Sequence, residues 1–272
     1  MRNLSLAFHK TYYNSLTPTA FQDVQSANNY IYESTFRHET DYQAPGPMVT
    51  HHFILTVCYP GLLIGTGNAH DSGTDPQEIS MGFNMDYVTG QPYISASSVK
   101  GFLRNHFRDH REAVAGLSGL TEAQVQELEK EIFDYSDVFF DAVVYDGYNE
   151  RLVGPDYMSP HVSPTQNPVP IILLKLLPEV RLSFRFRLKD SPTMTADQKE
   201  ALFKKMLLSF SFGAKRSSGY GILREDEKAG KVECIRAKCP QCGCLNYRFD
   251  KRTNAPTKSW PNCYRCQTAL FE

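Results

Sequence analysis

Residues 180–188 constrain the fold more than any other stretch of this chain. Apolar residues alternate there with arginine and serine, in the order Val180, Arg181, Leu182, Ser183, Phe184, Arg185, Phe186, Arg187 and Leu188. Strict alternation predicts a β-strand with one buried face, because successive side chains of a strand point to opposite sides. The chain must therefore build a sheet whose apolar face is covered, and the other face of this strand is mainly arginine.

Helices to cover such a sheet are predicted from capping signals. Thr195 and Gln198 form a capping box ahead of apolar residues at helical spacing, and Thr121 begins a second helix. A third helix is expected to begin at Ser97 or Ser98, since serine is a favoured N-cap.

Further strands are expected at about 49–58, within 137–145 and around 231–236. Residues 73–94 and the proline-rich stretch 154–170 show little periodicity and are predicted to be loops. In chain order the elements run strand, helix, strand, strand, helix, strand. This order predicts an α+β domain of the ferredoxin-like (RRM-like) type with long insertions.

Length and composition limit the classes of protein to which this chain can belong. A chain of 272 residues can form one sizeable core and a small module, and 41% hydrophobic with 22% charged residues is ordinary for a folded protein. The chain has no run of about 18 apolar residues and no apolar signal segment, so a cytoplasmic protein without a membrane partner is expected. We predict an N-terminal extension over residues 1–47 that packs on a core domain over residues 48–236.

Cysteines near the C-terminus have the spacing of a zinc ribbon. The four that form two C-x2-C pairs are Cys239, Cys242, Cys263 and Cys266. Two residues between ligands allow both thiolates of a pair to reach one tetrahedral ion. Residues 237–272 are therefore predicted to be held by a structural Zn²⁺ with no open coordination position. Cys244 is an alternative to Cys242, and redox-active dithiols are the alternative use of the pairs.

A glycine-rich stretch over residues 213–221, here called the glycine loop, has the inventory of a phosphate-binding turn. Glycine permits positive φ and a close approach of backbone N–H groups to an anion, and basic and hydroxyl side chains lie between the glycines. Such groups suit a phosphodiester backbone and read no base. The RNA contacts predicted in the loop are Gly213, Lys215, Arg216, Ser217, Ser218, Gly219, Tyr220 and Gly221. A plain structural turn is the alternative.

The predicted helix start near residue 97 is a second candidate phosphate site. Ser97 and Ser98 would leave N–H groups at the positive end of the helix dipole, and Lys100 and Arg104 lie one turn apart on one face. Together with the glycine loop it would form one phosphate cradle. An ordinary capped helix is the alternative. The net charge of −1 argues against a protein coated in nucleic acid, so such a contact must be local.

These motifs together resemble the RAMP superfamily of CRISPR-associated proteins. The resemblance rests on Gly61-Leu-Leu-Ile-Gly-Thr-Gly, on Tyr93-Ile-Ser-Ala-Ser-Ser-Val-Lys-Gly and on the glycine loop. Asp156-Tyr-Met-Ser-Pro-His, Gln166-Asn-Pro-Val-Pro and Asn3-Leu-Ser-Leu are similar to the sixth, filament-capping subunit of type III-B (Cmr) effector complexes. The similarity covers roughly residues 1–235, and the zinc ribbon is not part of that pattern.

The resemblance implies a non-catalytic, RNA-binding subunit of an antiviral ribonucleoprotein. Such a subunit holds the guide RNA by its backbone near the 3′ end of the guide and helps to present its bases to target RNA. The implied protein partners are a backbone RAMP subunit, a small helical subunit and another RAMP subunit.

Three other functions remain open from the residues. Asp71, in the loop after the first strand, would hold a divalent ion for RNA cleavage, as an acidic residue does in backbone RAMP subunits. A guide-processing endonuclease would use His51, His52 or His161 as acid or base. A protein–protein adaptor built on the zinc ribbon would contact no RNA, although the glycine loop and the arginine-bearing strand speak against it.

Overall fold

The computed structural model describes ten segments of the chain, and the chain divides into two compact units, Met1–Glu225 and Asp226–Glu272. The described residues are 3–12, 24–33, 48–64, 78–81, 83–147, 151–158, 171–225, 235–238, 241 and 245–248. Several predicted site residues lie outside the described residues, namely Asp71, His161, Cys239, Cys242, Cys244, Cys263 and Cys266.

The first unit is built on an antiparallel sheet and has an α+β fold, as predicted. The strands of this sheet are β1 (His51–Val57), β3 (Tyr93–Ile94), β4 (Val138–Phe139), β5 (Ala142–Asp146), β8 (Arg181–Arg187) and β9 (Leu223–Glu225). Their order is β3-β5-β8-β1-β9, with β4 also paired to β8. The alternating stretch is confirmed as a central strand, because β8 pairs with both β1 and β5. Its buried face consists of Val180, Leu182, Phe184, Phe186 and Leu188.

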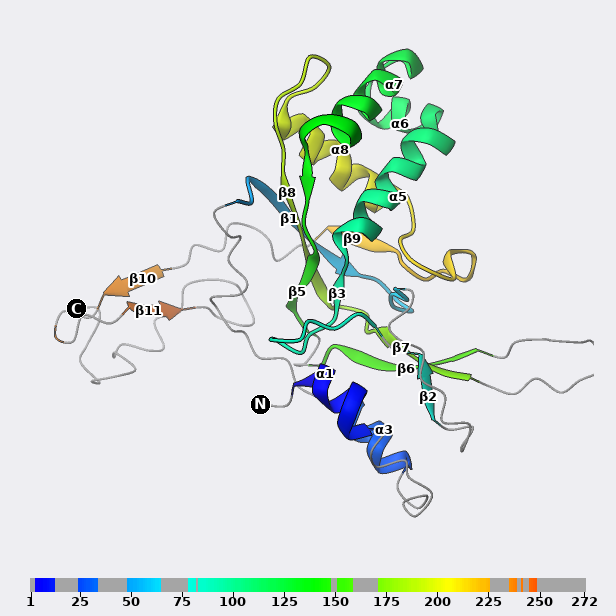
Figure 1. The fold of residues 1–272 in the computed structure, drawn as a ribbon, viewed down its shortest axis with the longest axis vertical. Coiled ribbons are helices and arrows are strands. Elements are labelled where there is room, and N and C mark those ends of the chain that lie inside the picture. Colours follow the sequence, from blue (N-terminus) through cyan, green and yellow to red (C-terminus); the bar gives the residue numbers. More distant parts are fainter. Residues whose placement is uncertain are drawn as a thin grey trace, which may run out of the picture. The chain divides into compact units, whose positions relative to one another are not determined.

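Helices gather on one side of this sheet (Figure 1). They are α5 (Ala96–Asp109), α6 (Arg111–Ser118), α7 (Glu122–Lys130), the π-helix η3 (Glu131–Ser136) and α8 (Ala196–Ser209). Thr121 and Thr195 make the predicted caps, each within a capping box. Helix α5 begins slightly earlier than predicted, because Ser95 is its N-cap and accepts a hydrogen bond from the Ser98 N–H. Helix α6 was not predicted, and it buries only Val114.

A second sheet contains residues that were predicted to be loops. It consists of β2 (Ile79–Met81), β6 (Val153–Met158) and β7 (Ile171–Leu176), in the order β2-β7-β6. The loop prediction was therefore wrong for residues 154–158, where Pro155 pairs with Leu174. Proline is tolerated there because β6 is an edge strand of this sheet, where a missing N–H can face away from the neighbour. It was also wrong for β2 and the short β3.

The described residues of the N-terminal segment contribute side chains to the core. The segment forms α1 (Leu4–Leu6), the π-helix η1 (Ala7–Tyr12) and α3 (Val24–Tyr32), and its most buried side chains include Phe8, Tyr12 and Ile31. The Tyr12 hydroxyl donates to Asn28 Oδ1 (2.6 Å) and accepts from the Ile79 N–H (2.8 Å). The Tyr12 phenol of η1 thus joins α3 and β2.

A fully buried ion pair lies between α8 and the start of β4. Lys199 Nζ is 2.9 Å from Asp137 Oδ2, and both side chains are 0% exposed. Lys199 also donates to the Lys189 carbonyl (2.8 Å), and Asp137 Oδ1 accepts from the Lys189 N–H (2.9 Å). Each charge is therefore hydrogen-bonded on more than one side, which is what makes its burial tolerable.

In the second unit the described strands β10 (Ile235–Lys238) and β11 (Leu245–Arg248) form an antiparallel pair. The first C-x2-C pair falls between them in the sequence. Among the helices within the described segments, none combines the length and apolar character needed to cross a bilayer.

Candidate RNA-binding site

The glycine loop is held against the segment that follows β1. The Ala214 N–H donates to the Leu63 carbonyl (2.8 Å), and the Gly221 N–H donates to the Gly61 carbonyl (3.0 Å). Gly213 has a φ of 87°, and a Cβ there would collide with the Leu63 carbonyl. The backbone contacts of the folded protein therefore already require glycine at this position.

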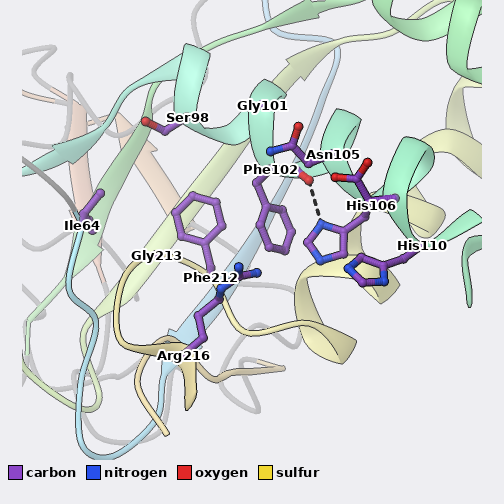
Figure 2. Close-up of a pocket in the computed structure, with 11 residues that line it drawn as sticks. Ile64, Ser98, Gly101, Phe102, Asn105, His106, His110, Phe212, Gly213 and Arg216 are labelled. Carbon is purple, nitrogen blue, oxygen red and sulfur yellow. Dashed lines mark hydrogen bonds between the residues drawn. The ribbon is translucent and has the colours of Figure 1, made fainter. Parts of the chain in front are cut away.

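The glycine loop and helix α5 meet at a pocket of about 440 Å³ (Figure 2). Helix α5 and the residue after it contribute Ser98, Gly101, Phe102, Asn105, His106, Asp109 and His110. The glycine loop and the segments beside it contribute Ile64, Phe212, Gly213 and Arg216. Two motifs more than a hundred residues apart in the sequence thus line one cavity.

Three of the predicted RNA contacts line this pocket: Ser98, Gly213 and Arg216. Arg216 begins the 3-10 turn η4 (Arg216–Ser218), is exposed, and extends toward the pocket in Figure 2. Ser217 and Ser218 lie on the same turn and are exposed. The cation, the hydroxyl groups and the mouth of the pocket therefore share one surface.

Lys100 and Arg104 lie on the opposite side of α5. Lys100 Nζ donates to the Phe133 carbonyl (3.1 Å), and Arg104 forms an ion pair with Asp134 (3.2 Å). Both partners belong to η3, so these two cations attach α5 to η3. With about 3.6 residues per turn, positions 100 and 104 fall on the face away from Ser98.

The N-terminus of α5 already holds a carboxylate. The Ala96 N–H donates to Asp141 Oδ1 (2.7 Å), and the Ser97 and Ser98 hydroxyls lie 3.0 and 2.8 Å from Ser95 Oγ. An RNA phosphate at this end would meet the negative charge of Asp141. The pocket side of the helix is the more open part of the predicted cradle.

Asp156 on β6 lies beside Lys215 of the glycine loop. Lys215 Nζ lies 3.9 Å from Asp156 Oδ2, and both Lys215 and Lys175 place Nζ within 6 Å of the Tyr220 ring centroid, at 5.7 and 5.8 Å. Burial raises the pKa of Tyr220 to about 12, and the neighbouring Asp156 carboxylate raises it further. The phenol therefore stays protonated at pH 7.

The arginine face of β8 is partly covered. Arg181 is 6% exposed, with Nη1 3.6 Å from Asp146 Oδ2, and burial lowers the pKa of Arg185. This face is not simply a row of solvent-exposed cations.

His106 is the most buried titratable group of the pocket. Its Nδ1 donates to the Phe102 carbonyl (2.7 Å; dashed in Figure 2), and its ring stacks on Phe210 with centroids 4.3 Å apart. Burial lowers the pKa of His106, and the nearby charges of His110 and Arg216 lower it further. Its imidazole is therefore neutral at pH 7, with Nε2 as an acceptor.

The histidines proposed as catalysts from the sequence lie elsewhere. His51 and His52 are on β1, and His51 Nε2 is 3.1 Å from Asp197 Oδ1 on α8. Among the described residues, no three His, Cys, Asp or Glu side chains come together in a group able to hold a metal ion.

A model of the RAMP superfamily matches residues 54–224, well over half of the chain. The chain is a RAMP-superfamily protein. The match runs from β1 to β9 and so includes both α5 and the glycine loop of this RAMP protein. No protein of curated function matches it in sequence.

A chain of the cryo-EM structure of the type III-B Cmr-beta bound to cognate target RNA has a similar fold. It is 20% identical, with a TM-score of 0.53, over 77% of this RAMP protein and 73% of that chain. The crystal structure of Cmr6 from Pyrococcus furiosus is also 20% identical, with a TM-score of 0.41, over 65% of this chain and 98% of that one.

The sequence interpretation overlooked several pocket residues of this RAMP protein, above all Phe102, Asn105 and His106. Helical spacing from Ser98 could have found them, because residues three, four, seven and eight positions further on share its face. The charged pair at 100 and 104 directed attention to the opposite face instead. Phe212 was overlooked because it precedes the glycine loop and has no polar group.

Proposed function

We propose that this RAMP protein is a non-catalytic RNA-binding subunit of a type III-B CRISPR effector complex. The observation that carries the proposal is the shared pocket of α5 and the glycine loop, with Arg216 exposed at its edge. Membership of the RAMP superfamily and the fold shared with a chain of an RNA-bound type III-B structure support it.

In this proposal the subunit caps the backbone of the complex near the 3′ end of the guide RNA. It holds the guide by its sugar-phosphate backbone and helps to present the bases to target RNA. Its neighbours are a backbone RAMP subunit, a small helical subunit and another RAMP subunit. These roles follow from the resemblance of the Asp156-Tyr-Met-Ser-Pro-His and Asn3-Leu-Ser-Leu motifs to the capping subunit.

We further infer that the core is a ferredoxin-like domain. Its elements follow the order β1, α5, β5, β8, α8, β9, and the spatial order β5-β8-β1-β9 is antiparallel throughout. Two successive strand-helix-strand units of this kind are the pattern of the ferredoxin-like motif. The second sheet and helices α6 and α7 are then insertions into it.

The test of RNA binding is its salt dependence. Replacing Arg216 by Ala should reduce the slope of log K against log salt by about 0.7 for single-stranded RNA, the value of one lost phosphate contact. The loss of affinity should be similar for unrelated sequences. Fluorescence anisotropy at several salt concentrations measures both.

Arg104→Ala is the matched control, because Arg104 is bound to Asp134 on the other face of α5. Its salt slope should equal that of the wild type. An unchanged slope for Arg216→Ala together with a reduced slope for Arg104→Ala would place the RNA on the η3 side and reject the pocket.

The absence of catalysis is tested with the purified chain. Labelled single-stranded RNA should remain intact after incubation with or without Mg²⁺. Cleavage that disappears in Asp71→Ala would instead support the metal-dependent endoribonuclease.

A further inference from the structure

Gly101 occupies the interior of α5 and lines the pocket. Glycine is among the least favourable residues in a helix interior, because it loses the most backbone freedom on folding. Gly213 is required by close backbone neighbours, but a Cβ at Gly101 would meet no described atom within 4 Å. The described structure therefore offers no steric reason for glycine at this position. The space above Gly101 is available to a ligand.

The walls of the pocket suit a flat, partly polar ligand. The Phe102 and Phe212 rings meet edge to face with centroids 4.9 Å apart, and the His106 ring lies 4.4 Å from Phe102. Phe212 and His106 are 2% and 4% exposed, whereas Phe102 is half-buried. The Phe102 ring is therefore the aromatic surface of the pocket on which a nucleobase can stack.

Polar groups complete the pocket near its mouth. Asn105 is exposed and carries both a donor and an acceptor, as the edge of a nucleobase does. Arg216 is the one lysine or arginine among the described residues that line the pocket. A phosphate alone would need more positive charge than this wall supplies, and it would make no use of the aromatic rings. A base inside the pocket, with its phosphate at Arg216, uses both sets of groups.

We propose that the pocket beside Gly101 holds one unstacked nucleobase of the bound RNA, while Arg216 contacts the adjoining phosphate. The inference rests on the RNA-binding function proposed above. The proposed contact requires a base. It is additional to the contacts that the protein makes with the sugar-phosphate backbone. At about 440 Å³ the pocket lies toward the small end of ligand sites, in keeping with a single base.

The experiment uses the full-length chain and two fluorescent single-stranded RNAs of equal length, one intact and one with abasic riboses in its central part. The wild type should bind the intact RNA about fivefold or more tightly than the abasic RNA, as one stacked base contributes. Gly101→Ala should abolish this difference by weakening the intact RNA only. The same variant should melt about 2–4 °C higher, since alanine favours the helix and meets no clash.

Gly116→Ala is the matched control. Gly116 lies in α6, its added Cβ would also meet nothing within 4 Å, and it does not line the pocket. This variant should melt slightly higher and bind both RNAs as the wild type does. Asn105→Ala, at an exposed position of the pocket, should weaken intact RNA only and keeps the test valid if Gly101→Ala fails to fold.

Other results would overturn the inference. Unchanged binding of intact RNA by both pocket variants would mean that nothing enters the pocket, and equal weakening of both RNAs would assign it to ribose or phosphate. A wild type that binds both RNAs equally well rejects the base pocket and leaves the RNA-binding function standing. A wild type that binds neither RNA rejects the RNA-binding function and the base pocket with it.

Discussion

His106 connects the pocket to the stability of the domain. Its ring stacks on Phe210 and makes a tilted contact with Phe102, and its Nδ1–H donates to the Phe102 carbonyl. Protonation would place a charge beside Arg216 and His110 in a buried position, while the Asp109 carboxylate and the Phe102 carbonyl partly offset that cost. The neutral imidazole is therefore part of the folded structure.

The stability of the protein should depend on the ionisation of His106. Burial lowers the pKa of His106 in the folded chain, whereas in the unfolded chain it is near the ordinary value of about 6.5. The unfolded chain thus binds the proton more readily, and stability is lost as the pH falls below about 6.5 toward the lowered value. Melting temperatures across this range should fall less steeply for His106→Gln than for the wild type. Parallel curves for the two proteins would contradict this assignment.

At the scale of elements, helix α5 has two faces with different tasks. Lys100 and Arg104 attach one face to η3, and Ser98, Gly101 and Asn105 line the pocket on the other. The register of the helix decides which set meets the glycine loop. Ser95 and Asp141 hold its first turn in place.

The ion pair of Lys199 and Asp137 should be the costliest polar contact to break among those described. Asp137→Ala leaves the Lys199 ammonium buried without its counter-charge, and the free energy of unfolding should fall by about 3–5 kcal/mol. Urea denaturation measures the change. Replacing both partners by apolar residues should recover much of it, because no charge then remains buried.

The exposed pair of Glu127 and Lys130 provides the comparison. Both side chains are more than half exposed, so Glu127→Gln should change stability by less than about 1 kcal/mol. Equal losses of unfolding free energy for Asp137→Ala and Glu127→Gln would contradict this prediction. The buried ion pair would then stabilise the α8 side of the core no more than an exposed pair does.

At the scale of the whole molecule, the chain consists of two compact units, and we expect them to have different sources of stability. The first has an extensive apolar core. In the second, the paired strands β10 and β11 flank the first C-x2-C in sequence, an arrangement that suits a zinc knuckle at a hairpin turn. Metal binding would then supply most of the folding free energy of residues 226–272.

We predict one tightly bound Zn²⁺ per chain, held by Cys239, Cys242, Cys263 and Cys266. Cys239→Ser should release the metal and unfold the second unit, and the unfolding transition of the first unit should remain. Elemental analysis and calorimetry measure the two effects. Cys58→Ser is the control, since Cys58 is a free thiol in the first unit and its loss should leave the zinc in place. Protein purified without chelator that contains no zinc would contradict the prediction.

Local interactions account for the features of the fold that could be predicted from the order of residues. The strand over 180–188, the capping boxes at Thr121 and Thr195 and the positive φ of the glycine loop all arise between residues close in the chain. Alternation, caps and glycine conformations can therefore be read directly from the order of residues. The α+β class followed from these elements, and so did the two motifs of the candidate site.

Which side chains those motifs bring together depends on contacts between distant segments. Strand β6 exists because β7 pairs with it, and the long-range pairing outweighs the local preference of its proline. Likewise, η3 holds Lys100 and Arg104 and leaves the Ser98 face of α5 to the glycine loop. Both outcomes depend on contacts between segments distant in the chain. The free energies of these contacts are absent from any local pattern of residues. The sequence therefore indicated two motifs of a candidate site, and packing selected which of their residues line the pocket.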